Sequence, residues 1–349
     1  MSVPGPLPGC DQQPPTDGAV DLRVAVIGAR RVRNGTGPFL ARQAQRAGAK
    51  VEAVLGTRPA SAREAVEELA ADGISARAYV DYRELFEEVR PDAVIVATPV
   101  GTHRPWLQAA LDAGAHVYCE KPLMTGPAER VKELARRFAA AELVLAENCQ
   151  WPFVLPAFRR LHPDADLAAA GRFRMLLAPP MRGIHRWQET LSHPISLLQA
   201  AAPGPAVLED IRFQEAGPEA PDARLDFRWR SLDRVLDCEV MLEDLEEWPR
   251  PAGFAFDDHE CRRRIDVEDY GMRLEAEDAA GDAGGGEPPV RSVPLDDPME
   301  AALRAFLVRA TAVRRGEQGV GIDEDLVRRQ ALLEILLDSY RAQVRHGTR

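Results

Sequence analysis

Strand-like and helix-like segments alternate almost strictly between residues 22 and 146. Short apolar runs, typical of buried parallel strands, occur at 22–27, 51–55, 93–97, 116–119 and 143–146. Segments with helical signals separate them, at 38–47, 62–71, 82–89, 105–113 and 126–140. Because parallel strands need crossover connections, this order predicts an open, doubly wound parallel sheet of the Rossmann type.

The pattern changes after residue 151. Helical segments are expected at 154–162, 191–201, 299–315 and 323–345, and strands at 171–177, 208–215, 223–229, 234–242 and 271–277. The strands tend to alternate apolar and polar residues, and a Gly- and Asp-rich stretch at 279–289 resembles a hairpin tip. With 349 residues, the chain is too long for one typical core. We therefore expect a flexible tail over 1–20, a Rossmann domain over 21–148, and an α+β domain with a large, mostly antiparallel sheet over 149–349.

Composition narrows the classes of partner. The net charge of -11 argues against nucleic acid and against anionic membranes. No apolar run reaches the length of a spanning helix, and the first residues lack the features of a secretory signal. The five scattered cysteines have no Cys-x-x-Cys spacing, which favours free thiols in a reducing cytoplasm.

The loop after the first strand departs from the usual dinucleotide fingerprint. Gly28 stands at the first glycine position, whereas Arg30 stands at the second, and either Gly35 or Gly37 closes the loop. Thr36 or Gly37 would begin the helix, whose amides favour an anion. We expect these five residues to bind the pyrophosphate of a dinucleotide. The alternative is a strand-to-helix turn that binds nothing.

The end of the second strand bears on the choice of cofactor. An acidic residue there would bind the ribose 2′-hydroxyl of NAD, but this chain has Thr57 and Arg58. A hydroxyl and a guanidinium both suit a phosphate, so the sequence favours NADP over NAD. The alternative is that Arg58 is a solvated residue at the start of a helix.

Residues 93–123 carry an ordered motif: a strand, Thr98-Pro99, His103, a helix, Ala113-Gly114, His116-Val117, a second strand and Glu120-Lys121-Pro122. In this order and spacing the stretch resembles the Gfo/Idh/MocA oxidoreductase family, named for glucose-fructose oxidoreductase and inositol dehydrogenase. The resemblance extends more weakly over nearly the whole chain after residue 20. It implies hydride transfer, a nicotinamide cofactor and a sugar- or cyclitol-like substrate.

Lys121 is the main catalytic candidate. The chain has only three lysines among 44 basic residues, so a lysine at a motif position carries weight. It follows a parallel strand at its carboxyl end, where such sheets bind ligands, and could stabilise negative charge during hydride transfer. By resemblance, the cofactor-binding set also includes Thr98, Pro99, His103, Glu120, Lys121 itself and Asn148. The alternative is a surface lysine.

A second motif of the family, Asp-x-Gly-x-His-x-x-Asp, is only partly present. His193 matches the histidine and could transfer a proton at neutral pH. Glu189 replaces the first acid, Leu191 the glycine and Ser196 the second acid, which leaves the proton-transfer role open. His193 could equally be a core histidine. Trp151, His185, Glu189 and Ser196 are further candidates for substrate contact.

These features predict an NADP-dependent oxidoreductase acting on a sugar, cyclitol or related carbonyl or imine small molecule. A protein that binds NADP(H) without turnover and regulates a partner is the alternative. Relatives of this family suggest a homodimer or homotetramer. No metal is expected, since His259 and Cys261 lack further ligands.

Overall fold

The computed structural model describes residues 20–347 except 31–34, 218–219, 233, 246–247 and 278–288. The tail predicted over 1–20 and the tip predicted over 279–289 therefore lie outside the described residues, apart from one residue of each. The chain forms two compact units. The first comprises Met1–Cys149 and Met299–Gln330, and the second comprises Gln150–Pro298 and Ala331–Arg349.

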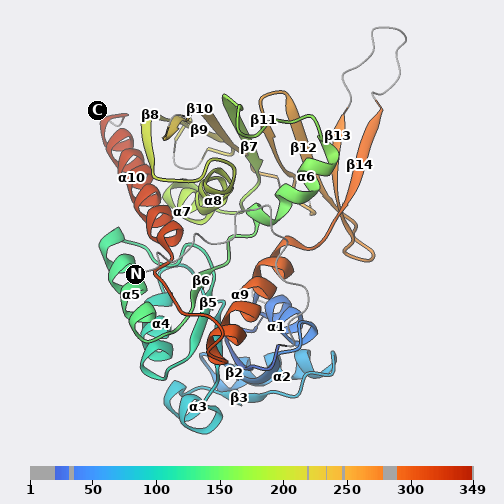
Figure 1. Ribbon diagram of the computed structural model, residues 1–349, viewed down its shortest axis with the longest axis vertical. Helices are drawn as coiled ribbons and strands as arrows, with labels where there is room; N and C mark the ends of the chain where they lie inside the picture. Colours follow the sequence, from blue (N-terminus) through green and yellow to red (C-terminus); the bar gives the residue numbers. More distant parts are fainter. Residues whose placement is uncertain are drawn as a thin grey trace. The chain divides into compact units, whose positions relative to one another are not determined.

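Six parallel strands form the sheet of the first unit, in the order β3-β2-β1-β4-β5-β6. They are β1 (Arg23–Ile27), β2 (Lys50–Leu55), β3 (Arg77–Tyr79), β4 (Ala93–Val96), β5 (His116–Cys119) and β6 (Leu145–Glu147). Figure 1 labels β2, β3, β5 and β6 of this sheet. The connecting helices are α1 (Gly37–Arg46), α2 (Pro59–Ala70), α3 (Tyr82–Val89), α4 (His103–Asp112) and α5 (Ala128–Ala140). The predicted doubly wound parallel sheet is confirmed. Only the short strand β3 was not expected.

Helices cover both faces of this sheet. Leu85, Leu107 and Val131, from α3, α4 and α5, pack with Val117 and Cys119 of β5 in one buried cluster. Side chains alternate along a strand, so Tyr118 points to the other face. There its ring lies 5.4 Å from that of Phe306 on α9 (Pro298–Arg314). Helix α9, far along the chain, therefore completes the core of the first unit.

The strand order places a switch point between β1 and β4. The chain leaves β1 toward β2 on one side, and β4, β5 and β6 follow on the other. The loops after β1 and β4 therefore diverge at the carboxyl edge of the sheet. Sheets of this kind bind ligands at such a point.

Eight strands form the sheet of the second unit, in the order β14-β13-β12-β11-β7-β10-β9-β8. They are β7 (Arg172–Leu177), β8 (Ala206–Gln214), β9 (Ala223–Ser231), β10 (Arg234–Leu242), β11 (Ala252–Phe256), β12 (His259–Ile265), β13 (Met272–Glu277) and β14 (Val290–Leu295). All neighbours are antiparallel except β7 and β10. The predicted mostly antiparallel sheet is confirmed, although β11, β12 and β14 were not expected.

The helical part of the second unit comprises η1 (Trp151–Val154), α6 (Leu155–Leu161), α7 (Gly183–Thr190), α8 (Ser192–Ala201) and the latter part of α10 (Glu324–Gly347). One face of β9 and β10 is buried, with Phe227 and Val240 among its residues, whereas the other face carries arginines and acids. In the described part of the chain, no helix is both long and apolar enough to span a bilayer.

Candidate functional site

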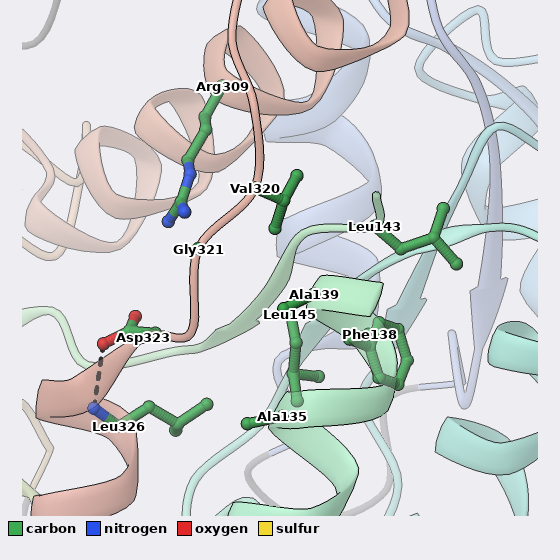
Figure 2. A pocket seen from close by; sticks show the side chains of 10 residues that line it. All are labelled: Ala135, Phe138, Ala139, Leu143, Leu145, Arg309, Val320, Gly321, Asp323 and Leu326. Carbon is green, nitrogen blue, oxygen red and sulfur yellow. Dashed lines mark hydrogen bonds between the residues drawn. The ribbon is translucent and has the colours of Figure 1, made fainter. Parts of the chain in front are cut away.

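The hollow shown in Figure 2 is not a substrate site. It lies in the first unit, between α5 and the segment that joins α9 to α10. Apolar side chains such as Phe138 and Leu145 line much of it, and Arg309 and Asp323 also face it. Its interior has room for about one water molecule. The loops that carry the nominated residues of the first unit lie elsewhere, at the carboxyl edge of the parallel sheet.

Two glycines shape the turn after β1. Gly28 has a φ of +90°, and a Cβ there would lie 2.7 Å from the carbonyl oxygen of Ala97. A Cβ on Gly37 would lie 2.2 Å from the carbonyl oxygen of Gly28. Gly37, rather than Gly35, is thus the glycine that lets α1 pack against the strand end. Residues 31–34 between them lie outside the described residues.

The start of α1 offers backbone amides. Thr36 occupies the N-cap position, but its side chain makes no capping hydrogen bond. Its hydroxyl instead donates to Oε1 of Glu120, at 2.5 Å. Amides in the first turn that no side chain caps fit the pyrophosphate of a dinucleotide.

Glu120 is the centre of a hydrogen-bond network after β5. Besides Thr36, the side-chain amide of Asn148 donates to Glu120 Oε1 at 2.8 Å, and the hydroxyl of Tyr118 donates to Asn148 Oδ1 at 2.8 Å. The amide of Lys121 donates to Glu120 Oε2 at 3.2 Å. This Thr36–Glu120–Asn148 network joins the loop after β1 to the ends of β5 and β6. Three residues that the sequence nominated separately are therefore brought together.

Lys121 lies in a turn that is held by its neighbours. The ring of His103 is buried, with Nδ1 at 3.1 Å from the carbonyl oxygens of both Pro122 and Leu123 and Nε2 at 2.8 Å from that of Thr98. His103 thus links the turn that carries Lys121 to the loop after β4 and supports this turn from its buried side. Lys121 itself is half-buried, as are Glu120 and Thr98, whereas Pro99 is exposed.

A buried ion pair supports the same turn from the other side. The carboxylate of Glu147 accepts from the amide of Leu123 at 2.8 Å and from Nε of Arg329 at 2.6 Å. The Glu147 side chain is 3% exposed and that of Arg329 11%. Burial opposes the charge on Arg329, but Cys149 and Glu147 outweigh it and raise the pKa of the guanidinium. Sequence reasoning missed this pair, because its members are 182 residues apart.

The end of β2 has no carboxylate, as expected. Gly56 allows α2 to approach, since a Cβ there would lie 2.8 Å from the amide nitrogen of Ala62. Thr57 and Arg58 are exposed. Arg30, on the loop after β1, is exposed and pairs with Glu64 of α2 at 2.7 Å.

In the second unit, His193 lies in the first turn of α8 and is half-buried. The edge of its ring faces the buried indole of Trp151, with ring centroids 6.3 Å apart. The hydroxyl of Ser196 donates to the backbone carbonyl of His193 at 2.9 Å. Ser196 therefore serves its own helix and does not replace the missing acid.

The other candidates of the second unit lie on α7. His185 is exposed and its Nδ1 lies 3.1 Å from Gln188 Oε1, while Glu189 is half-buried. Trp187 is fully buried between Phe213 and Tyr340, so it belongs to the core. Among the described residues, no three His, Cys, Asp or Glu side chains gather as a metal ion would require.

Comparison with known proteins gives a family for the first unit. Residues 22–149 match the Gfo/Idh/MocA oxidoreductase family, described by its NAD-binding Rossmann fold. The chain is 39% identical over 112 residues to dTDP-3,4-didehydro-2,6-dideoxy-alpha-D-glucose 3-reductase of Streptomyces violaceoruber. That match covers 31% of each protein, so it spans less than a third of the length of this curated relative.

Solved structures share the fold over nearly the whole chain. A 3-ketoreductase from Actinomadura kijaniata, in complex with TDP-benzene and NADP, gives a TM-score of 0.63 at 18% identity, covering 90% of this chain and 96% of that one. An inositol dehydrogenase homologue from Azotobacter vinelandii, complexed with NAD+, also gives 0.63 at 18% identity, covering 93% and 96%. One structure holds NADP and the other NAD+, so the fold admits either cofactor.

Proposed function

Because the chain belongs, through residues 22–149, to the Gfo/Idh/MocA oxidoreductase family, we propose that it is an NADP-dependent oxidoreductase. Its substrate would be a sugar, a cyclitol or a related carbonyl or imine compound. The observation that carries this proposal is the Thr36–Glu120–Asn148 network. It fixes the side chain of Glu120, the residue before Lys121, at the carboxyl edge of the parallel sheet. The reductase and the inositol dehydrogenase homologue to which the chain is similar support this substrate class.

The residues of the first unit fit a nicotinamide dinucleotide. Gly28, Gly37 and the amides of α1 would hold the pyrophosphate, with Gly35 and Thr36 beside them. The loops with Thr98, Pro99, Glu120 and Asn148 would line the remainder of the site. When bound, the cofactor would donate or accept the hydride.

Preference for NADP rests on Thr57 and Arg58. Both side chains are exposed where a Rossmann domain holds the adenosine ribose, and neither repels a 2′-phosphate. Arg30 adds positive charge, although Glu64 offsets it. The Arg58→Ala variant should bind NADP about 10- to 100-fold more weakly, with affinity for NAD nearly unchanged. Fluorescence titration of both reduced cofactors measures this, with Arg83→Ala on α3 as the control; an unaltered NADP-to-NAD ratio would reject the assignment.

Lys121 would donate a hydrogen bond to the reacting oxygen of the substrate and stabilise its negative charge. His193 of the second unit would give or take the proton. Because Ser196 leaves His193 without the family's second acid, reduction of a ketone or imine is proposed alongside oxidation of an alcohol.

The Lys121→Ala variant tests the proposal. We expect kcat to fall about 100- to 1,000-fold, the cost of losing one donor to a developing oxyanion. NADP affinity should change far less. Lys132→Ala on α5, whose lysine pairs with Glu129 at the surface, is the matched control. An unchanged rate for Lys121→Ala would remove this residue from the mechanism.

A regulatory protein that binds NADP(H) without turnover is the second candidate. Arg30 in the glycine loop and Ser196 in place of the acid favour it. Tight NADP binding with no turnover in a screen of polyols, ketones and imines would select this candidate over the enzyme.

We further propose that the protein is a cytoplasmic homodimer or homotetramer. Cys119, Cys149, Cys238 and Cys261 are buried and form no disulfide among the described residues, as suits a reducing compartment. The outer face of the second sheet carries ion pairs such as Arg230–Glu209 and Arg264–Glu275, which could pair across a twofold axis. Sedimentation at low and high salt tests this, and a monomer at every concentration would refute it.

A further inference from the structure

Arg263 on β12 differs from its neighbours on the strand. Arg262 and Arg264 are exposed and lie within ion-pair distance of acids, at 3.1 Å from Glu260 and 2.9 Å from Glu275. Side chains alternate along a strand, so Arg263 shares the opposite face with Cys261, which is fully buried. The sheet therefore turns one arginine of this strand inward.

The inward guanidinium lies over one aromatic ring, and no carboxylate contacts it among the described residues. Its central carbon lies 5.4 Å from the centroid of the Trp151 ring. The same indole meets the rings of Phe254, at 6.0 Å, and of His193, at 6.3 Å. Nε of Arg263 is buried and has no hydrogen-bond acceptor within the described residues. The side chain as a whole remains partly accessible.

This arrangement costs free energy. Burial lowers the pKa of Arg263, and the charge of Asp297 only partly opposes this. A desolvated cation without an anionic contact destabilises a fold, and contact with an indole face offsets only part of the penalty. A buried polar group left unsatisfied calls for an explanation.

Two other inward arginines of the second unit donate to backbone carbonyls, although each also keeps one buried nitrogen without an acceptor among the described residues. Arg234 donates to the carbonyl of Ala201 at 2.8 Å and also to that of Leu167. Arg186 donates to the carbonyl of Met181 at 3.1 Å and also to that of Ala220. Arg263 lacks such bonds among the described residues, so packing alone does not account for it.

We propose that Arg263 and Trp151, next to His193, form a binding site for an oxyanion, a carboxylate or a phosphate, carried by the substrate. The guanidinium, which lies over the buried indole, would bind the anionic group through paired hydrogen bonds. This rests on the proposed function in one respect, namely that the ligand is a substrate. The anion site itself stands on the second unit alone.

Binding of anionic and neutral probes to the full chain tests the site. Calorimetric titration would use glucuronate, inorganic phosphate and uridine diphosphate as oxyanions and glucose as the neutral control. Glucuronate reports a preference for a carboxylate, and the other two report a preference for phosphate. Wild type should bind at least one oxyanion, and Arg263→Met should weaken that binding about 10- to 100-fold.

Arg262→Met, one residue away on the outer face, should bind the same oxyanion as wild type does. The melting temperature of Arg263→Met should equal or exceed that of wild type, since the variant removes a desolvated cation and keeps an apolar side chain over Trp151. A purely structural arginine would instead lower it. Absence of oxyanion binding by wild type, or equal binding by Arg263→Met, would overturn the proposal.

NADP titration separates this proposal from the proposed function. If the protein binds oxyanions through Arg263 but no nicotinamide cofactor, the site stands and the enzyme assignment fails. If a neutral sugar is turned over equally by wild type and Arg263→Met, and neither binds an oxyanion, the enzyme assignment stands and the anion site fails.

Discussion

Substitutions in the buried ion pair of Glu147 and Arg329 test most directly what supports the candidate site. Glu147 accepts from the amide of Leu123, two residues after Lys121, as well as from Arg329. Replacing Arg329 with Met would leave a carboxylate that is only 3% exposed without its cation. The turn that carries Lys121 would then be hydrogen-bonded to a buried carboxylate that has lost its counterion.

The expected loss of stability follows from this burial. Removing one partner of a buried ion pair costs about 3–5 kcal/mol, because the remaining charge stays desolvated. Arg329→Met and Glu147→Gln should each lose stability in that range. The double variant removes both charges, so it should recover at least about 2 kcal/mol relative to the sum of the single variants.

Urea denaturation of the four proteins measures this coupling. The control is Arg77→Met, which breaks an ion pair with Glu88 whose members are both more than half exposed, and it should cost no more than about 1 kcal/mol. NADP affinity and the turnover that depends on Lys121 should both decline in the single variants, at temperatures where these variants stay folded. If Arg329→Met is no less stable than the control, the ion pair does not support the turn.

Two further predictions concern the first unit. Burial lowers the pKa of His116 to about 4, against a smaller opposing effect of Asp92, and the ring accepts from the amide of Val144 at 2.9 Å. Since the pKa is lower in the folded state than the ordinary value of 6.5, the stabilisation is complete above that value and is lost as the pH falls toward 4. Wild type should thus lose about 2 kcal/mol of its free energy of unfolding between about pH 7.5 and about pH 5 through this residue. His116→Asn cannot titrate, so its free energy of unfolding, measured by urea denaturation, should fall about 2 kcal/mol less over the same pH range. Equal losses in the two proteins would disprove the assignment. Gly37→Ala should abolish NADP binding or folding, because the added Cβ would meet the carbonyl oxygen of Gly28, whereas Gly171→Ala, with open space around its Cβ, should behave as wild type in NADP titration and thermal melting.

The sequence predicted the first unit well because its signals are local. Parallel strands buried on both faces are short apolar runs, and glycines such as Gly28 and Gly114 mark the turns between them. Helix α2 shows the limit of such signals. The sequence predicted a helix from residue 62, but the helix begins at Pro59, and the Ser61 hydroxyl donates back to the carbonyl of Arg58.

The second unit was predicted less completely because its inner strands lack the expected alternation. Strand β11 is buried throughout and spans only five residues, while β12 carries three successive arginines. A run rich in charge does not resemble a strand until its partners are known. Likewise, no local pattern indicates that α9 covers the sheet of the first unit, since that contact depends on Phe306 meeting Tyr118.

The motif residues were found from the sequence, but the ion pair of Glu147 and Arg329 that supports them was not. Position 196 shows what else the motif alone does not tell. The motif alone indicates that a carboxylate is missing there. In the structure, the Ser196 hydroxyl bonds to the backbone of His193, so the substitution removes a charge without disturbing the start of α8. The ring of His193 is placed instead against Trp151, a residue outside the motif. Since the ring contact of His193 comes from Trp151, Trp151→Ala should lower turnover more than Ser196→Ala, which removes only a bond to the backbone.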